Sequence, residues 1–90
     1  MEVIFDPAKN AENIRKHGIS LQRAEDLDED TAIYDLDDSQ DYGEERWNLI
    51  GWLDTKLHTL TVTYLPDNKI RAISLRKSTT QEQRNYADEY

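Results

Sequence analysis

The spacing of apolar positions along this 90-residue chain first follows a helical period and later changes to alternation. Residues 2–5 form a short apolar run that predicts a first strand. A helix is predicted over residues 7–17, because Asp6 can cap its start and Gly18 can end it. Its apolar positions recur every three residues, at Ala8, Ala11 and Ile14. Ser20 can cap a second helix, whose inward positions are Leu21, Ala24 and Leu27.

Beyond residue 32 the apolar residues alternate with polar ones, which is the period of a half-buried strand. Strands are predicted at about residues 32–36, 45–53, 57–65 and 69–77. Turns at residues 54–56 and 66–68 join the last three strands into an antiparallel meander. Thr79 and Glu82 form a capping box, which starts a final helix near residue 80.

The order of these elements defines the predicted fold class. One strand, two helices, four strands and a last helix make an α+β fold, with an antiparallel sheet, two N-terminal helices and one C-terminal helix. Ninety residues are enough for a single domain, over residues 1–90, with a thin core. The residues predicted to be buried include Ile14, Leu49, Leu60, Val62, Ile73 and Leu75.

Composition excludes several classes of protein. The chain has no cysteine, so it contains neither disulfides nor thiolate metal sites, and with two histidines a zinc site is not expected. No glycine-rich phosphate loop and no Ser/His/Asp spacing is present, and we expect no cofactor. Residues 1–9 do not resemble a signal peptide, and no run approaches the roughly 20 apolar residues of a membrane span. We therefore expect a cytoplasmic protein that does not associate with membranes.

The net charge of −8 is unevenly distributed along the chain. Residues 24–45 carry eleven acidic groups and no basic one, whereas residues 46–84 have a balance of +4. The second half can therefore present a cationic surface within an anionic protein. The acidic segment has three interpretations: a solvated loop, a docking site for a basic partner such as a DNA-binding antitoxin, or a mimic of nucleic acid.

Several short motifs occur in order along most of the chain. The first group is Phe5-Asp6-Pro7-Ala8-Lys9, Asn13 and Lys16-His17-Gly18-Ile19-Ser20. The middle group is Gly43-Glu44-Glu45-Arg46 followed by Ile50-Gly51. The last group is Ile70-Arg71-Ala72-Ile73-Ser74-Leu75-Arg76-Lys77 with Glu82, Arg84 and Tyr86. In this combination the chain resembles the BrnT toxin family, whose fold is related to that of the RelE-like ribonuclease toxins.

The resemblance implies an endoribonuclease toxin of a type II toxin–antitoxin pair. It implies metal-independent cleavage of RNA and neutralisation by a cognate DNA-binding antitoxin. The chain departs from the family in its acidic run between residues 25 and 45. It also has Arg23 where the family tends to have a glutamate. The alternative is a non-catalytic module that keeps the toxin fold only to bind a protein partner.

Cleavage of RNA without a metal needs cations that offset charge on the phosphorane, and arginine binds phosphate oxygens in pairs. The candidates are Arg46, Arg71 and Arg76, all on predicted strands. In a regular strand Arg71 and Arg76 point to opposite faces, unless a bulge intervenes. The alternative role is that of solvated arginines paired with acidic residues. If phosphate stabilisation dominates, Arg76→Ala slows cleavage about 100-fold.

Proton transfer has three candidate groups. His17 titrates nearest neutrality, although a histidine before a helix-ending glycine can also cap that helix. Glu45 can act as a base, orient Arg46, or form a cross-strand ion pair with Arg71 or Arg76. Tyr86 lies one turn after Glu82 and can either pack in the core or stack on a base.

The two tryptophans have opposite parity in one predicted strand, so one is expected to be buried and the other exposed. An exposed Trp47 or Trp52 can stack on RNA, fill a groove of an antitoxin, or cover an edge of the sheet.

Overall fold

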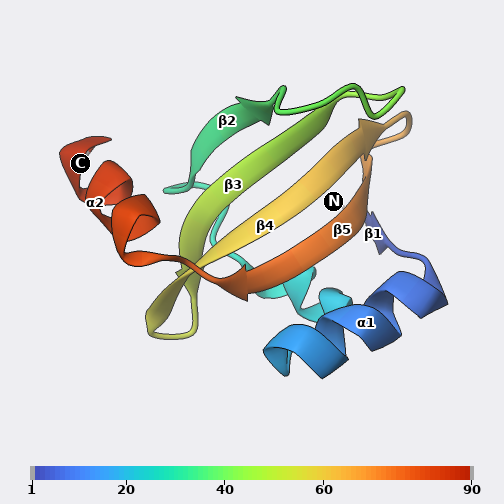
Figure 1. The fold of residues 1–90 in the computed structure, drawn as a ribbon, viewed down its shortest axis with the longest axis horizontal. Helices are drawn as coiled ribbons and strands as arrows, with labels where there is room; N and C mark the ends of the chain where they lie inside the picture. Colours follow the sequence, from blue (N-terminus) through green and yellow to red (C-terminus); the bar gives the residue numbers. More distant parts are fainter. Residues whose placement is uncertain (1, 90) are drawn as a thin grey trace.

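Residues 2–89, which the computed structural model describes, form one five-stranded sheet with helices on both of its faces (Figure 1). The elements are β1 (Glu2–Ile4), α1 (Pro7–His17), the 3-10 helix η1 (Leu21–Asp26), β2 (Ile33–Asp37), β3 (Arg46–Leu53), β4 (Lys56–Leu65), β5 (Lys69–Lys77) and α2 (Thr80–Glu89). This order and the α+β class confirm the prediction. Within the described chain, neither α-helix is long and apolar enough to cross a membrane.

The sheet is mixed, which corrects the prediction of an antiparallel sheet. Its strand order is β1-β5-β4-β3-β2, and the four later strands pair antiparallel. β1 instead lies parallel to β5, with Val3 opposite Ile70. Helices separate β1 from every other strand along the chain, so no hairpin forces it into an antiparallel pair. Alternation predicts that a strand exists, but not which strand it pairs with.

A polar side chain anchors α1 to the sheet. The Asp6 side chain caps its start, and Gly18 ends it with a φ of 71°, as predicted. Asn13 is buried at the edge of β5 beyond the end of β1. There its side-chain nitrogen donates to the carbonyl of Leu75 at 2.8 Å, and its oxygen accepts from the Leu75 N–H at 3.0 Å. The predicted burial of Ile14 is wrong: the residue is 46% exposed, because Asn13 occupies the position that faces the sheet.

The second predicted helix is a single short 3-10 segment, η1. The Ser20 side chain caps it by accepting from the Gln22 N–H at 3.2 Å. It ends at Asp26, where the acidic run begins, and it still turns its apolar side chains inward as predicted. Those side chains, Leu21, Ala24 and Leu27, belong to the main hydrophobic cluster.

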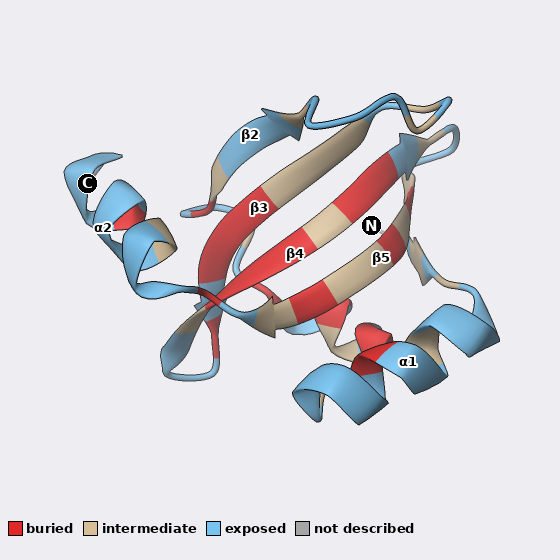
Figure 2. Cartoon of the chain, viewed as in Figure 1, coloured by how far each residue is buried: buried red, intermediate tan, exposed pale blue. Residues whose placement is uncertain are grey.

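The core lies between η1 and one face of the central strands, where the buried positions in Figure 2 are concentrated. Four of the residues predicted to be buried are fully enclosed there: Leu49, Leu60, Val62 and Leu75. Ile73 is only partly buried. The reason is a bulge in β5, described next.

A β-bulge changes which way the residues of β5 point. Val62 of β4 pairs with Ala72, but the preceding Thr61 pairs with Ser74, so Ile73 is an extra residue without a partner on β4. Ala72 and Leu75 can therefore both face the core although they are three positions apart. The residues that flank them turn to the opposite face of the sheet.

Candidate functional site

The bulge at Ile73 brings three arginines to one face of the sheet. Arg71 lies opposite Thr63 and Arg76 lies opposite Thr59, and both threonines alternate with the core residues of β4. Arg46 begins β3 one position before Trp47, whose partner is Val62 on the core side. We call this surface the arginine face. Its side chains come from Arg46, Asn48, Thr59, Thr61, Thr63, Arg71, Ser74 and Arg76.

Glu44 holds two of the arginines together. Its carboxylate accepts from Arg71 Nη2 through one oxygen and from Arg46 Nε at 3.3 Å through the other. The Arg71 guanidinium is the main reason that the pKa of Glu44 is lowered, and Arg46 adds to this effect. The ring of Tyr42 lies beneath Arg46, with the guanidinium carbon 4.0 Å from the ring centre. This Arg46–Glu44–Arg71 cluster therefore carries one net positive charge.

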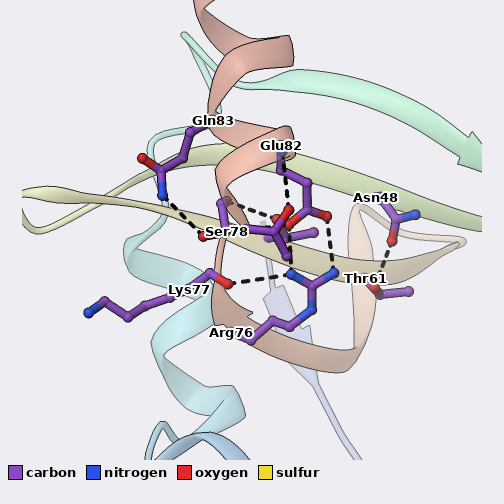
Figure 3. A network of polar contacts seen from close by, with 9 residues as sticks. Asn48, Thr61, Arg76, Lys77, Ser78, Glu82 and Gln83 are labelled. Carbon is purple, nitrogen blue, oxygen red and sulfur yellow. Dashed lines mark hydrogen bonds and ion pairs between the residues drawn. The ribbon is translucent and has the colours of Figure 1, made fainter.

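The third arginine forms a closed pair with the last helix (Figure 3). Arg76 donates to both carboxylate oxygens of Glu82, at 2.7 and 3.0 Å. Glu82 also accepts from the Thr79 N–H at 2.8 Å, while the Thr79 hydroxyl accepts from the Glu82 N–H at 3.1 Å. The Arg76 guanidinium, followed by the Thr79 N–H, lowers the pKa of Glu82 to about 2. The predicted capping box is present, and one of its members neutralises Arg76.

Hydroxyl groups lie between the two arginine groups. Thr61 donates to the side-chain oxygen of Asn48 at 2.7 Å, as Figure 3 shows. The hydroxyls of Thr59 and Ser78 are 2.9 Å apart, and Thr63 donates to the carbonyl of Glu45 at 3.2 Å. The middle of the arginine face is therefore polar but uncharged.

A hollow of about 290 Å³ opens beside the Arg46–Glu44–Arg71 cluster at the start of α1. It is lined by Asp6, Lys9, Arg46, Arg71, Ala72 and Ile73. The side chain of Lys9 is exposed, and among the described residues no hydrogen bond or ion pair holds it. Three cations and one carboxylate thus border this hollow, which makes it the most cationic part of the arginine face.

Lys9 and Glu44 were not identified as candidate site residues from the sequence. Lys9 on an exposed helix looks like an ordinary solvated lysine, although it lies one turn before Asn13, which contacts β5. Glu44 was passed over in favour of Glu45. The structure places Glu45 in an exposed position, and it gives the predicted ion pair with Arg71 to Glu44 instead. β3 begins only at Arg46, so strand parity does not govern the two glutamates before it.

The structure does not bring His17 or Tyr86 to this hollow. His17 is exposed in the last turn of α1, two turns beyond Lys9, and the backbone N–H of Gly18 caps that helix. Tyr86 is the buried residue of α2, and its hydroxyl donates to the carbonyl of Thr31 at 3.0 Å. The ring of Trp52 lies edge-on to it at 6.1 Å. As predicted, Trp52 is exposed and lies on the opposite face from Trp47, which is partly buried against the core.

This arrangement can bind an anion through planar guanidinium groups. Glu44 and Glu82 are ionised at neutral pH, as carboxylates ordinarily are, and their arginine partners lower their pKa values further. A carboxylate with a low pKa is a weak base, so both are better suited to orient arginines than to remove protons. The strongest anion site is where Lys9, Arg46 and Arg71 converge.

Comparison with known proteins gives a consistent result. A family model described as "Ribonuclease toxin, BrnT, of type II toxin-antitoxin system" matches residues 5–82. The crystal structure of the Brucella abortus ribonuclease toxin BrnT matches with a TM-score of 0.68 and 20% sequence identity, covering 89% of this chain and 99% of that chain. At this identity the structural match shows a shared fold. No curated protein matches the chain.

Proposed function

This chain belongs to the BrnT family of ribonuclease toxins of type II toxin–antitoxin systems, and on that premise we propose that it cleaves RNA on its arginine face without a metal ion. The observation that supports this most directly is that Arg46, Arg71 and Lys9 line one hollow at the edge of the arginine face. The proposed site of action is the cytoplasm, where the RNA substrate is found.

In the proposed reaction the ribose 2′-oxygen attacks the adjacent phosphorus and loses its proton. The bond from phosphorus to the 5′-oxygen breaks, and that oxygen gains a proton. The products carry a 2′,3′-cyclic phosphate and a 5′-hydroxyl. Arg46, Arg71 and Lys9 would stabilise the negative charge that develops on the phosphorane oxygens. Glu44 would hold the two guanidinium groups in position.

The proton-transfer groups stay predictions. His17 occurs at the same four-residue spacing as Lys9 and Asn13, so it belongs to the face of α1 that Asn13 turns toward β5. Histidine is the residue type that most often acts as a general acid or base. The variant His17→Gln distinguishes a role in proton transfer from a role in capping the helix. Loss of the acidic limb of the pH–rate profile supports proton transfer, and an unchanged profile contradicts it.

The activity is tested with purified protein, single-stranded RNA and excess EDTA. We expect cleavage in the chelator, with 2′,3′-cyclic phosphate ends detected by mass spectrometry. Cleavage that disappears with EDTA and returns with Mg²⁺ would contradict the metal-independent reaction. Arg84→Ala is the control for Arg71→Ala, because Arg84 is an exposed arginine on α2.

A second candidate function is supported by the pairing of charges. Each arginine of the face is in contact with a carboxylate, and the chain has a net charge of −8. A phosphate must compete with Glu44 and Glu82 for these groups. This favours, as the alternative, a non-catalytic module that binds only a protein partner. Absence of cleavage by protein that still binds such a partner would identify this alternative.

Family membership also leads us to propose a cognate antitoxin as the protein partner. An antitoxin of such a pair typically combines a DNA-binding part with a segment that covers the toxin. We propose a DNA-binding antitoxin that forms a tight complex with this chain. Its binding would raise the melting temperature by mass action, which differential scanning fluorimetry would detect.

A further inference from the structure

The helices on the core face of the sheet leave one side of that face open. α1 and η1 pack against the β1 and β5 side, whereas β2 and the start of β3 lie beyond them (Figure 2). Large apolar side chains are exposed in this open part: Tyr34 at 46%, Leu36 at 41% and Tyr64 at 43%. Together with Trp47 we call them the aromatic patch.

The four side chains form one continuous surface across three strands. Leu36 lies opposite Trp47 in the pairing of β2 with β3. The rings of Trp47 and Tyr64 meet edge to face, with their centres 6.5 Å apart. Tyr34 shares this face because its partner Leu49 belongs to the core. Clustered aromatic side chains of this kind are typical anchors of protein–protein interfaces.

Acidic groups border the aromatic patch. Tyr34 donates from its hydroxyl to the carbonyl of Glu29 at 3.3 Å, so the loop after η1 lies next to the patch. This loop and η1 line a second hollow, also of about 290 Å³, with Val3, Glu25, Leu27, Asp28, Glu29 and Asp30. No basic side chain lines it. Partial burial is the main reason that the pKa of Tyr64 is raised to about 12, and the nearby Tyr34 and Glu29 add to this effect.

The apolar patch and its acidic border together indicate which kind of molecule can bind there. The phosphates of RNA would be repelled by the four carboxylates of the border. A second copy of the chain would bring the same acidic border against this one, and like charges in contact disfavour that arrangement. A segment with apolar residues for the patch and Lys or Arg for the border satisfies both features.

We propose that the aromatic patch and its acidic border are the docking surface for a basic, amphipathic segment of the antitoxin. That the partner is an antitoxin rests on the proposed function. The surface lies on the opposite side of the sheet from the arginine face. Binding of the partner and cleavage of RNA should therefore be separable by mutation.

The test measures the affinity of this chain for the purified product of the gene adjacent to its own. Leu36→Asp places a charge on the patch opposite Trp47 and should weaken binding at least 100-fold while leaving RNA cleavage unchanged. Ile14→Asp is the matched control, because Ile14 is 46% exposed, close to the 41% of Leu36, but lies on α1 outside the patch. This control should bind within twofold of the parent.

A second pair of variants tests the charge of the border. Glu29→Lys with Asp30→Lys should weaken binding about tenfold and flatten its dependence on salt. Glu12→Lys with Asp54→Lys, two exposed acidic positions on α1 and in the turn after β3, should change neither. Circular dichroism checks that each variant is folded. If Leu36→Asp does not fold, Tyr64→Ala and the charge pair decide the question.

Several results would overturn the proposal. Equal affinities for Leu36→Asp and Ile14→Asp would place the interface elsewhere, and no binding to the parent would remove the partner. Self-association of the parent that Leu36→Asp abolishes would identify a second copy as the occupant. Failure of the parent to cleave RNA would contradict the proposed activity alone, because the binding comparison does not depend on it.

Discussion

The arginine face contains two arginine–glutamate groups that are built differently. In the Arg46–Glu44–Arg71 cluster, one carboxylate from a loop serves two guanidinium groups, and Lys9 adds a third cation beside a hollow. In the other group Arg76 and Glu82 neutralise each other through two hydrogen bonds. The first group has a net positive charge beside its hollow, whereas the second is neutral, and the charged side chains that line the hollow next to Glu82 are all acidic.

The first group is therefore suited to bind an anion, and the second is suited to hold a helix. Glu82 belongs to the capping box at the start of α2, and Tyr86 is the one buried residue of that helix among the residues described. The Arg76–Glu82 pair therefore contributes to holding α2 against the sheet. The sequence-based hypothesis gave Arg76 the leading role in cleavage, whereas the geometry favours Arg71.

Removal of Arg71 should have the largest effect on activity. Arg71→Ala leaves the hollow without the cation that Glu44 orients, so cleavage should slow about 100-fold, equivalent to about 2.7 kcal/mol. The measurement is the single-turnover rate with saturating RNA. Arg84→Ala should retain the rate of the parent. A reduction of less than threefold for Arg71→Ala would remove this residue from the site.

Removal of Arg76 should affect stability more than chemistry. Arg76→Ala leaves Glu82, whose side chain is 22% exposed, without its guanidinium partner. We expect the free energy of unfolding to fall by about 1 kcal/mol after allowance for screening by water. Cleavage should slow less than in Arg71→Ala. Urea unfolding and single-turnover rates on the same samples measure both effects, and the reverse ranking would restore Arg76 to the leading role.

Replacement of Lys9 should weaken binding to RNA by only a few-fold. Lys9→Gln removes one phosphate contact from the hollow, so the slope of log affinity against log salt should fall by about 0.7 for a single strand. Binding is titrated at three salt concentrations with uncleavable 2′-O-methyl RNA. Lys16→Gln, two turns farther along the same helix and paired with Glu12, is the control. Equal slopes for the two variants would show that the hollow does not bind phosphate.

The smallest effect should appear in the dependence of stability on pH. The pKa of Glu82 is lowered to about 2 from an ordinary value near 4.5. A lowered pKa stabilises the fold above pH 4.5, and this contribution is lost as the pH falls toward 2. Glu82→Gln should therefore flatten the loss of stability between pH 5 and pH 2. Glu12→Gln is the control.

Glu12 is a suitable control because Arg15, its main partner, also lowers its pKa to about 2. The Glu12 side chain is 48% exposed, so water screens this pair and its replacement should change the slope less. Equal slopes for the two variants would show that the Arg76–Glu82 pair is no stronger than a surface ion pair.

Sequence patterns predicted the elements well where local chemistry decides them. Alternation defined the four later strands, and Asp6, Gly18, Thr79 and Glu82 defined the ends of the helices. The partner of β1 could not be predicted, because short-range periodicity carries no information on pairing between distant segments. Asn13 took the inward position expected for Ile14 because the edge of β5 needed hydrogen bonds rather than apolar contact.

The candidate site was predicted only in part. Arg46 and Arg71 were identified by residue type, but no local signal in the sequence fixes the bulge that puts Arg71 and Arg76 on one face. Glu45 was preferred to Glu44 because the strand was expected to start one residue too early. Lys9 belongs to the first sequence motif, but nothing in that motif gives it a role in the site, since its importance comes from the position of α1 beside β5.

The bulge at Ile73 also has a consequence for how this chain can change in evolution. Arg71 and Arg76 are separated by an odd number of positions, and only the extra residue lets them share a face. Deletion of Ile73 alone would leave the two arginines four positions apart, and regular pairing would then keep both on the same face. We therefore expect loss of this one residue to be tolerated better than loss of any residue that pairs with β4. Among homologues, the interval between the two arginines should be five positions where the bulge is present and four where it is absent.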